Sequence, residues 1–406
     1  MSAQPRKRVA PRAAPETAAE LARRYECVAL VLQGGGALGA YQCGVYEALH
    51  EAGIRPDWFA GTSIGAINAA ILAGNAPERR AERLREFWET ICEPAGVLAW
   101  PFQAFAAGAV WLPPSLGLNA GMAAVSALGA LAHGQRGFFT PRLLPPFALH
   151  DGSAAATSFY DTSPLKATLE RLVDFDRINH GDVRLSVGAV ALSNGNVRYF
   201  DSAGETIRAE HVMASGALPP AFPAIEIDGE HYWDGGLVSN TPLDHVLGAQ
   251  PQRDALVLQV DVWSARGAAP CSMMDVLERQ KDIQYSSRTR FGTDTVARLQ
   301  KLRNALGRLI EQLPGGRLPD ALVADLEPWL CDRVFNIVHL IYQAKHHEEQ
   351  YKDYAFGPAA MREHWSAGRS DMLQSLAEPR FFTLPERSLG VVTHDIHRLA
   401  RATANV

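Results

Sequence analysis

Two repeats of one local pattern, an apolar strand followed by a glycine-rich turn and a helix, constrain the fold of this 406-residue chain more than any other feature. The first strand, CVALVL, is rich in β-branched residues, and the turn QGGGALG follows it directly. The second repeat runs from WFA through GTSIG into AINAAILAG. The segments of the two repeats are 27–32, 33–39 and 40–50, then 58–60, 61–65 and 66–74. Strands that alternate with helices in this way predict an α/β protein with a parallel sheet buried between helices.

Further strands and helices are predicted in the rest of the chain. Residues 182–201 contain two β-type runs around the turn 193–196, which predicts a hairpin. Residues 254–262 form another apolar strand pattern, and residues 335–342 return to strand character. Between them, residues 266–330 show the spacing of amphipathic helices. The C-terminal third is therefore expected either to cap the α/β core or to form a lobe of its own.

Composition and charge narrow the class of protein. Hydrophobic residues make up 47% of the chain and charged residues 20%, which is typical of a soluble globular protein. The chain has 39 basic and 44 acidic residues, so its net charge is −5. Nucleic-acid-binding domains usually carry a strongly basic face. Nucleic acid is therefore not an expected partner.

The N-terminal residues and the cysteines indicate a cellular compartment. Residues 1–24 carry basic residues but no apolar stretch of a secretion signal, so we interpret them as a flexible basic tail. Five scattered cysteines without CxxC spacing argue against a disulfide framework or a thiolate metal site. They are Cys27, Cys43, Cys92, Cys271 and Cys331. We therefore expect reduced thiols and a cytoplasmic protein, with peripheral association at the inner membrane face as a further option.

The stretch 94–135 differs from the rest of the chain because its 42 residues include no Asp, Glu, Lys or Arg. Pro101, Pro113 and Pro114 interrupt it, and its second half is rich in Ala, Gly and Ser, which is a weak pattern for a membrane-spanning helix. Buried helices or a homo-oligomer contact explain the composition. A mobile apolar lid over a lipid site explains it equally well. A transmembrane helix is the third interpretation.

The second glycine turn, Gly61-x-Ser63-x-Gly65, has the spacing of a nucleophile elbow between a strand and a helix. The serine of such a turn has a strained backbone, and the glycines on either side leave room for it. Its oxygen then stands above the sheet at a helix N-terminus, where negative charge is stabilised. Ser63 is therefore a candidate nucleophile.

The first glycine turn places consecutive backbone amides at the same edge of the sheet. Gly34, Gly35 and Gly36 are candidates to donate hydrogen bonds to a tetrahedral oxyanion, an interaction worth roughly 3–4 kcal/mol per donor in one well-studied enzyme. With Gly39 the turn also fits the dinucleotide fingerprint G-x-G-x-x-G. That site requires an acidic residue at the end of the next strand. Asp57 precedes that strand instead, so the dinucleotide interpretation is rejected.

A nucleophilic serine requires a base. Asp234-Gly235-Gly236 lies between aromatic residues and a loop that contains a proline, and a plain polar turn also explains it. In a Ser-His-Asp triad the base would be a histidine instead. The histidine candidates are His50, His231 and His245. A histidine base should lose its rate below about pH 6.5, whereas a carboxylate near its reference pKa of about 3.9 should keep working.

One polar cluster resembles a metal site at first sight. His346-His347-Glu348-Glu349 lacks the second histidine of the HExxH motif, because Tyr351 stands in its place. We therefore interpret the cluster as a solvated segment, and neither a metal nor a cofactor is expected.

Three motifs in this order resemble those of the patatin-like phospholipase family. They are Gly-Gly-Gly-x-x-Gly after the first strand, Gly-x-Ser-x-Gly about 25 residues later, and a distant Asp-Gly-Gly. The segment ASGALPPAFPAI at 214–225 is similar to the one that this family carries before its Asp-Gly motif. The resemblance covers residues 27 to about 262. Residues 335–370 look like the C-terminal extension of a bacterial branch of the family.

The resemblance implies a three-layer α/β/α fold with a mostly parallel sheet at 25–265 and a mainly helical extension at 266–406. It implies a Ser–Asp dyad in which Asp234 takes the proton of Ser63 directly, with the three consecutive glycines as oxyanion hole. The remaining motif residues are Gly39, Gly61, Gly65, Gly235 and Gly236. Leu38 stands where many members carry a basic residue, which weakens the expectation of a phospholipid over a neutral lipid ester.

The activity implied by the resemblance is that of a serine acyl hydrolase of the phospholipase A or lipase type. Such an enzyme cleaves lipid acyl esters through an acyl-enzyme intermediate, at or near a membrane surface and without a cofactor. Two alternatives remain open at this stage. One is a non-catalytic lipid-binding or membrane-binding protein with the same fold, and the other is a Ser-His-Asp esterase.

Overall fold

The computed structural model describes residues 16–93, 130, 132–312, 319–326, 330, 333–343 and 352–397. Most of the uncharged stretch 94–135 therefore lies outside the described residues. The same holds for residues 1–15 of the predicted tail and for the polar cluster 346–349.

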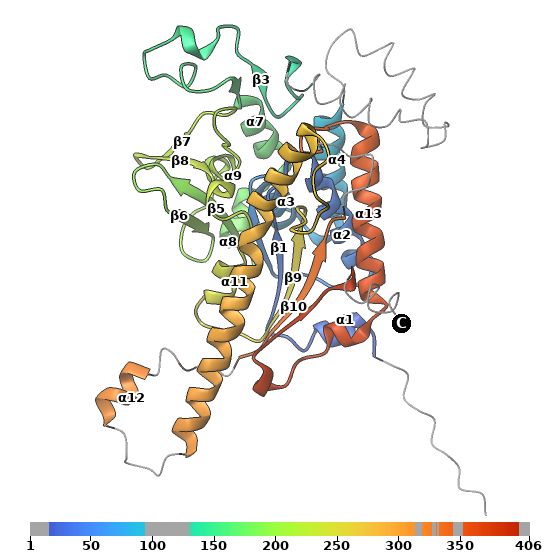
Figure 1. The fold of residues 1–406 in the computed structure, drawn as a ribbon, viewed down its shortest axis with the longest axis vertical. Coiled ribbons are helices and arrows are strands. Elements are labelled where there is room, and N and C mark those ends of the chain that lie inside the picture. Colours follow the sequence, from blue (N-terminus) through green and yellow to red (C-terminus); the bar gives the residue numbers. More distant parts are fainter. Residues whose placement is uncertain are drawn as a thin grey trace, which may run out of the picture.

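A mixed, mostly parallel sheet forms the centre of the molecule (Figure 1). The order of its strands is β11-β10-β9-β1-β2-β5-β8-β7, with β6 also paired to β5. The strands in parallel pairs are β1 (Cys27–Leu32), β2 (Trp58–Thr62), β5 (Arg184–Ala191), β9 (Ala255–Asp261), β10 (Phe335–Ile341) and β11 (Val391–His394). Antiparallel pairs add β6 (Val197–Asp201), β7 (Ile225–Ile227) and β8 (Glu230–Asp234). A separate short pair consists of β3 (Thr140–Pro141) and β4 (Tyr160–Asp161).

Helices cover both faces of the sheet, which makes the fold a three-layer α/β/α structure. Successive residues of β1 show this, because Leu30 and Leu32 join one apolar cluster while Ala29 and Val31 join another. The first face carries α1 (Ala18–Ala22), α2 (Ala40–Glu51), α3 (Ile64–Ala73), α4 (Arg80–Cys92), α7 (Ser163–Leu172), α8 (Phe175–His180), α9 (Ala209–Ser215) and α13 (Pro358–Leu376). The second face carries α10 (Leu243–Gly248) and part of α11 (Met273–Gln312). The end of α11 and the short α12 (Asp320–Leu326) project from the body (Figure 1).

Short 3-10 helices link several of these elements. They are η1 (Gly36–Gly39), η2 (Pro77–Arg79), η4 (Pro146–Ala148), η5 (Gly235–Leu237), η7 (Pro379–Phe382) and η8 (Arg387–Leu389). Two of them, η1 and η5, directly follow β1 and β8 at the edge of the sheet where the predicted site lies.

The sequence predicts the central elements correctly. The predicted α/β class and mostly parallel sheet are confirmed. The apolar run 27–32 is β1, buried along its whole length, and the hairpin predicted at 182–201 is β5 paired with β6. The two strands predicted around 254–262 and 335–342 are β9 and β10.

The C-terminal region extends the core sheet and does not form a lobe of its own. β10 pairs with β9 in parallel, with Phe335 opposite Ala255, and β11 pairs with β10. The predicted helical content is present in α11 and α13. α13 packs closely on α2, because a Cβ added at Gly44 would lie 1.9 Å from the Trp365 carbonyl oxygen, and one at Gly368 would lie 1.9 Å from that of Tyr41. Only glycine lets the two helix backbones approach so closely.

The described part of the predicted N-terminal tail is ordered. α1 begins with a capping box between Thr17 and Glu20, and Leu21 packs into the core. Residues 18–22 of the predicted tail are therefore helical and packed against the core.

Two further features of the described residues bear on the sequence analysis, namely the cysteines and the apolar character of the helices. Cys27, Cys43 and Cys92 are buried free thiols and Cys271 is an exposed one, while Cys331 lies outside the described residues. Among the helices described, none has the length and apolar character needed to cross a bilayer.

Candidate active site

Ser63 occupies the sharp turn between β2 and α3 in a strained backbone conformation, with φ 56° and ψ −127°. Positive φ is rare for a residue with a side chain and is concentrated at functional sites. The neighbouring glycines make room for the turn as predicted. A Cβ at Gly61 would lie 2.2 Å from the carbonyl oxygen of Gly65, and one at Gly65 would lie 2.3 Å from that of Leu32.

The amide of Ser63 is held by one residue of α9. It donates to the carbonyl oxygen of Ser215 at 3.1 Å and to its Oγ at 3.0 Å. The Ser215 hydroxyl in turn donates to the carbonyl of Gly188 at 2.6 Å. Ser215 therefore ties the strained turn to β5. It lies in the segment 214–225 that resembles the family, although the sequence analysis assigned it no role.

Strand β5 brings Asp234 to Ser63. Thr62, the last residue of β2, pairs with Gly188 of β5, and Asp234, the last residue of β8, pairs with the following Ala189. The ends of β2 and β8 therefore meet against one point of β5. The side chain of Ser63 lies close enough to the carboxyl of Asp234 to lower the pKa of that carboxyl. These two residues are 171 positions apart in the chain, and the strand pairing places them at the same edge of the sheet.

The carboxyl of Asp234 is buried, and none of the described residues forms an ion pair with it. Only 2% of the residue is exposed, and its Oδ1 accepts a hydrogen bond from the amide of Gly236 at 2.7 Å. Burial raises the pKa of Asp234 to about 7, although the hydrogen bonds from Ser63 and Gly236 act to lower it. A carboxyl with such a pKa is a competent base near neutral pH.

This pKa changes one expectation from the sequence. A carboxylate base near its reference value would work well below pH 6.5, but Asp234 becomes protonated at about pH 7. The pH profile therefore no longer separates a carboxylate base from a histidine base. The cause is burial, which a reference pKa for an exposed side chain does not include.

The glycine loop lies against the serine. A Cβ on Gly34 would lie 2.9 Å from Cβ of Ser63. The amide of Gly34 donates to the carbonyl of Asn240 at 3.1 Å, whereas the amides of Gly35 and Gly36 donate to no other described residue. Two of the three predicted oxyanion donors are thus free, and Gly34 differs from the prediction because its amide already has a partner.

Asn240 is a further site residue, which the sequence analysis missed. Its side-chain amide donates to the carbonyl of Gly34 at 2.9 Å, so both backbone groups of Gly34 bind Asn240. The indole of Trp263 donates to the same carbonyl at 2.8 Å. The signal that could have been used is the position of Asn240, six residues after Asp234 in the same loop.

The other motif glycines serve close packing. A Cβ at Gly39 would lie 2.7 Å from the Ile64 side chain, and one at Gly235 would lie 2.4 Å from the Gly188 carbonyl oxygen. Leu38, which stands at the family's basic position, is fully buried in the core. No charged group therefore occupies that position of the loop.

The three candidate histidines have surroundings away from this pair. Nε2 of His245 lies 2.8 Å from Oδ2 of Asp201, and its ring stacks on Tyr199. His231 is exposed on β8, and His50 stacks on Tyr46 at the end of α2. Neither Ser63 nor Asp234 has a hydrogen bond from any of them, so the geometry does not support a Ser-His-Asp triad.

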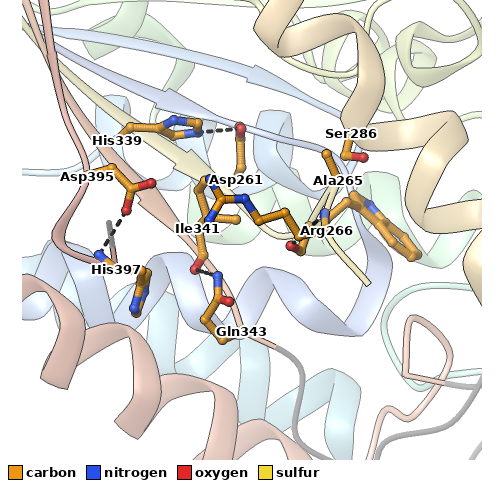
Figure 2. A pocket seen from close by; sticks show the side chains of 11 residues that line it. Asp261, Ala265, Arg266, Ser286, His339, Ile341, Gln343, Asp395 and His397 are labelled. Atoms are coloured by element: carbon orange, nitrogen blue, oxygen red, sulfur yellow. Dashed lines mark hydrogen bonds and ion pairs between the residues drawn. The ribbon is translucent and has the colours of Figure 1, made fainter. Parts of the chain in front are cut away.

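A polar pocket that does not include Ser63 or Asp234 lies beyond the ends of β9 and β10 (Figure 2). His339 faces Asp261 there, with Nε2 2.7 Å from Oδ2, and the amide of His397 donates to Asp395 at 2.9 Å. Within the described part of the chain, no group of three or more His, Cys, Asp or Glu residues is arranged to hold a metal ion.

The fold and the site define an α/β protein with a strained serine turn beside a buried carboxyl. A family model described as patatin-like phospholipase matches residues 30–247, and one described as patatin phospholipase matches residues 283–388. The first match covers more than half of the chain, so this protein belongs to the patatin-like phospholipase family, a family of lipid hydrolases.

Curated relatives share shorter segments. The chain is 57% identical over 58 residues to lysophospholipase nte1 of Aspergillus terreus, which is 14% of this chain and 4% of that protein. It is 38% identical over 88 residues to patatin-like phospholipase domain-containing protein 6 of Homo sapiens, which is 21% of this chain and 6% of that protein. The chain thus spans a small part of these relatives.

One solved structure is similar at low identity. The crystal structure of VipD from Legionella pneumophila aligns with a TM-score of 0.39 at 15% identity, covering 87% of this chain and 67% of that one.

Proposed function

We propose that this protein is a serine acyl hydrolase that cleaves lipid esters with Ser63 as nucleophile and Asp234 as base. The observation that supports this most strongly is the strained backbone of Ser63 next to the buried carboxyl of Asp234, whose pKa is raised to about 7. Membership of a lipid hydrolase family gives the substrate class.

The reaction proceeds in two halves. Asp234 accepts the proton of the Ser63 hydroxyl while its oxygen attacks the ester carbonyl, and the amides of Gly35 and Gly36 stabilise the oxyanion. Collapse expels the alcohol, which takes the proton from Asp234, and leaves an acyl group on Ser63. Asp234 then accepts a proton from water, which attacks the acyl carbonyl, and returns that proton to the serine oxygen as the acid leaves.

Two features support a lipid ester as substrate. The glycine loop carries Leu38 buried in the core, so it has no cation for a phosphate and suits a neutral lipid ester. A surface loop exposes Leu143 at 101% and Phe147 at 82% of their reference residue areas. The backbone amide of nearby Phe159 donates to the carbonyl of Pro220, in the segment before β7. These side chains offer apolar surface for peripheral contact with lipid.

Hydrolysis of p-nitrophenyl esters of short and long chain tests the proposal. The wild type should turn over and react with a fluorophosphonate, and mass spectrometry should find the label on Ser63. Folded Ser63→Ala should show neither reaction. An inert, unlabelled wild type, assayed with and without liposomes, would contradict the proposal. Liposome binding that survives Ser63→Ala without any turnover would favour the non-catalytic lipid binder.

A further inference from the structure

The segment that precedes α13 contacts the glycine loop through its backbone. The carbonyl oxygen of Asp353 accepts a hydrogen bond from the amide of Ala37 at 2.9 Å. A Cβ added at Gly36, whose φ is +55°, would lie 2.2 Å from the same oxygen. The carbonyl of Asp353 is thus seated directly on the loop whose free amides are those of Gly35 and Gly36.

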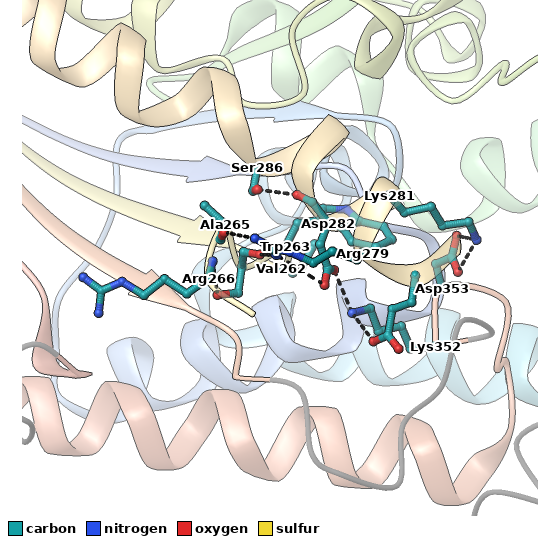
Figure 3. A network of polar contacts seen from close by, with 12 residues as sticks. Val262, Trp263, Ala265, Arg266, Arg279, Lys281, Asp282, Ser286, Lys352 and Asp353 are labelled. Carbon is teal, nitrogen blue, oxygen red and sulfur yellow. Dashed lines mark hydrogen bonds and ion pairs between the residues drawn. The ribbon is translucent and has the colours of Figure 1, made fainter. Parts of the chain in front are cut away.

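Ion pairs with α11 fix this segment (Figure 3). Nζ of Lys281 donates to both carboxylate oxygens of Asp353 at 2.9 Å. The adjacent Lys352, whose side chain is only 4% exposed, binds Glu278 at 2.9 Å and Asp282 at 2.8 Å. Charges on two successive residues are therefore matched by charges on one face of α11.

Two further residues of the C-terminal region, His364 and Lys352, contact the loop or a residue bound to it. Nδ1 of His364, on α13, lies 3.3 Å from the carbonyl oxygen of Ala37. Lys352 also stands over the ring of Trp263, whose indole binds the Gly34 carbonyl. Both backbone groups of Ala37 therefore have partners from beyond residue 350.

We propose that Asp353, held by Lys281, is a positioning residue for the oxyanion loop, so that the C-terminal region completes the active site. The inference rests on the proposed function, because it gives the loop a role in acyl transfer. Gly35 and Gly36 have no side chains to anchor them. The contact of the loop with the Asp353 carbonyl therefore determines the direction of their amides. Displacing an oxyanion donor by about 1 Å is expected to cost about a hundredfold in rate at most.

The test is Lys281→Met, which removes the charge and keeps much of the side-chain length. We expect kcat for p-nitrophenyl butyrate to fall about tenfold or more, while KM changes less than about threefold, because the oxyanion forms only in the transition state. Deuterium uptake of the peptide that contains Ala37 should rise. Lys281→Arg should restore both values toward those of the wild type.

A matched control is Arg387→Met. It breaks the pair between Arg387 and the buried Asp254, at 2.7 Å, in the same C-terminal region but at the start of β9, remote from the glycine loop. This variant should lose thermal stability without a change in kcat or in uptake at Ala37. If Lys281→Met behaves in the same way as this control, the positioning role is overturned.

Two further arms keep the test decisive. If Lys281→Met does not fold, Asp353→Asn is measured instead, and its kcat should fall about threefold or more with raised uptake at Ala37, since a neutral amide binds Lys281 more weakly. If the wild type turns over no faster than Ser63→Ala, the proposed function fails. Even then, unchanged deuterium uptake at Ala37 in the Lys281 or Asp353 variant would contradict the positioning of the loop by Asp353. Raised uptake would support it.

Discussion

Two aspartates on neighbours of β5, the partly buried Asp201 and the buried Asp234, have opposite acid–base properties. Asp201 pairs with Ser186 of β5, and Asp234 pairs with Ala189, three residues further on. Burial acts to raise the pKa of both carboxyls. At Asp201, hydrogen bonds from His245 and a bidentate Arg184 hold the pKa well below its usual range. The described surroundings of Asp234 offer the Ser63 side chain and the amide of Gly236, and its pKa rises to about 7.

The difference shows that the partners of a carboxyl, and not its burial alone, decide whether it can act as a base. A search of the structure for a carboxylate paired with a histidine would select Asp201 and His245, whose Oδ2 and Nε2 atoms lie 2.8 Å apart. Yet a carboxylate so strongly stabilised in its charged form has little tendency to take a proton. The carboxyl without a cation is the one placed beside the strained serine.

The largest expected effect is on activity. Asp234→Asn should lower kcat/KM by about 10³-fold, because the amide cannot accept the proton of Ser63. Asp201→Asn should keep kcat within about threefold per folded molecule while losing about 2–4 kcal/mol of stability, since Arg184 is left without its anion. Ester hydrolysis and chemical denaturation measure the two quantities. Equal loss of activity in both variants would remove the contrast between the two aspartates.

The two aspartates should give the free energy of unfolding opposite dependences on pH, because the pKa of Asp234 is raised and that of Asp201 is lowered. Asp234 has a folded pKa of about 7, above its unfolded value near 3.8, so the folded state binds more protons between these values and stability falls as pH rises from about 4 to 7. Asp234→Asn should therefore be more stable than the wild type at pH 8, by about 3 kcal/mol, with little difference at pH 4. Thermal unfolding at both pH values measures this. A variant less stable at pH 8 would contradict the raised pKa.

The pH dependence of kcat/KM should follow the protonation of the base, Asp234. Activity should reach its plateau above about pH 8 and fall roughly tenfold by pH 6, because the protonated Asp234 cannot act. The profile should be the same in His231→Ala. A plateau that continues below pH 5 would show that the base has an ordinary carboxyl pKa.

The smallest effect is expected at His245. Its replacement by alanine removes the hydrogen bond to Asp201 and the stacking on Tyr199, with a stability loss of about 1–2 kcal/mol. Activity should change less than about twofold. A large loss of kcat with an intact fold would instead support the Ser-His-Asp alternative.

Local sequence was sufficient for the parts of the site that depend on local sterics. The strained turn at Ser63 follows from glycines two residues to either side, and β1 follows from six consecutive apolar residues. From local sequence, the raised pKa of Asp234 can be stated only as a requirement of the mechanism. Its value depends on the burial of the carboxyl, with no ion-pair partner among the described residues, in a site built from three strands.

The remaining parts of the site depend on contacts between distant segments. The strand β8 was not predicted, since its pairing with β5 joins residues about 40 positions apart. The occupied amide of Gly34 depends on Asn240, 206 residues further on, and the seat of Ala37 depends on Asp353. No local pattern encodes which backbone donor meets which distant acceptor.

The pairing of β10 with β9 also determines how the protein would fail if shortened. All seven residues of β9 are buried, with β1 on one side and β10 on the other. A chain ending near residue 265 would leave this apolar strand as an open edge with bare backbone donors and acceptors. Such an edge templates pairing between copies and leads to aggregation. By pairing with β9, the C-terminal region therefore also covers an edge that would otherwise promote aggregation.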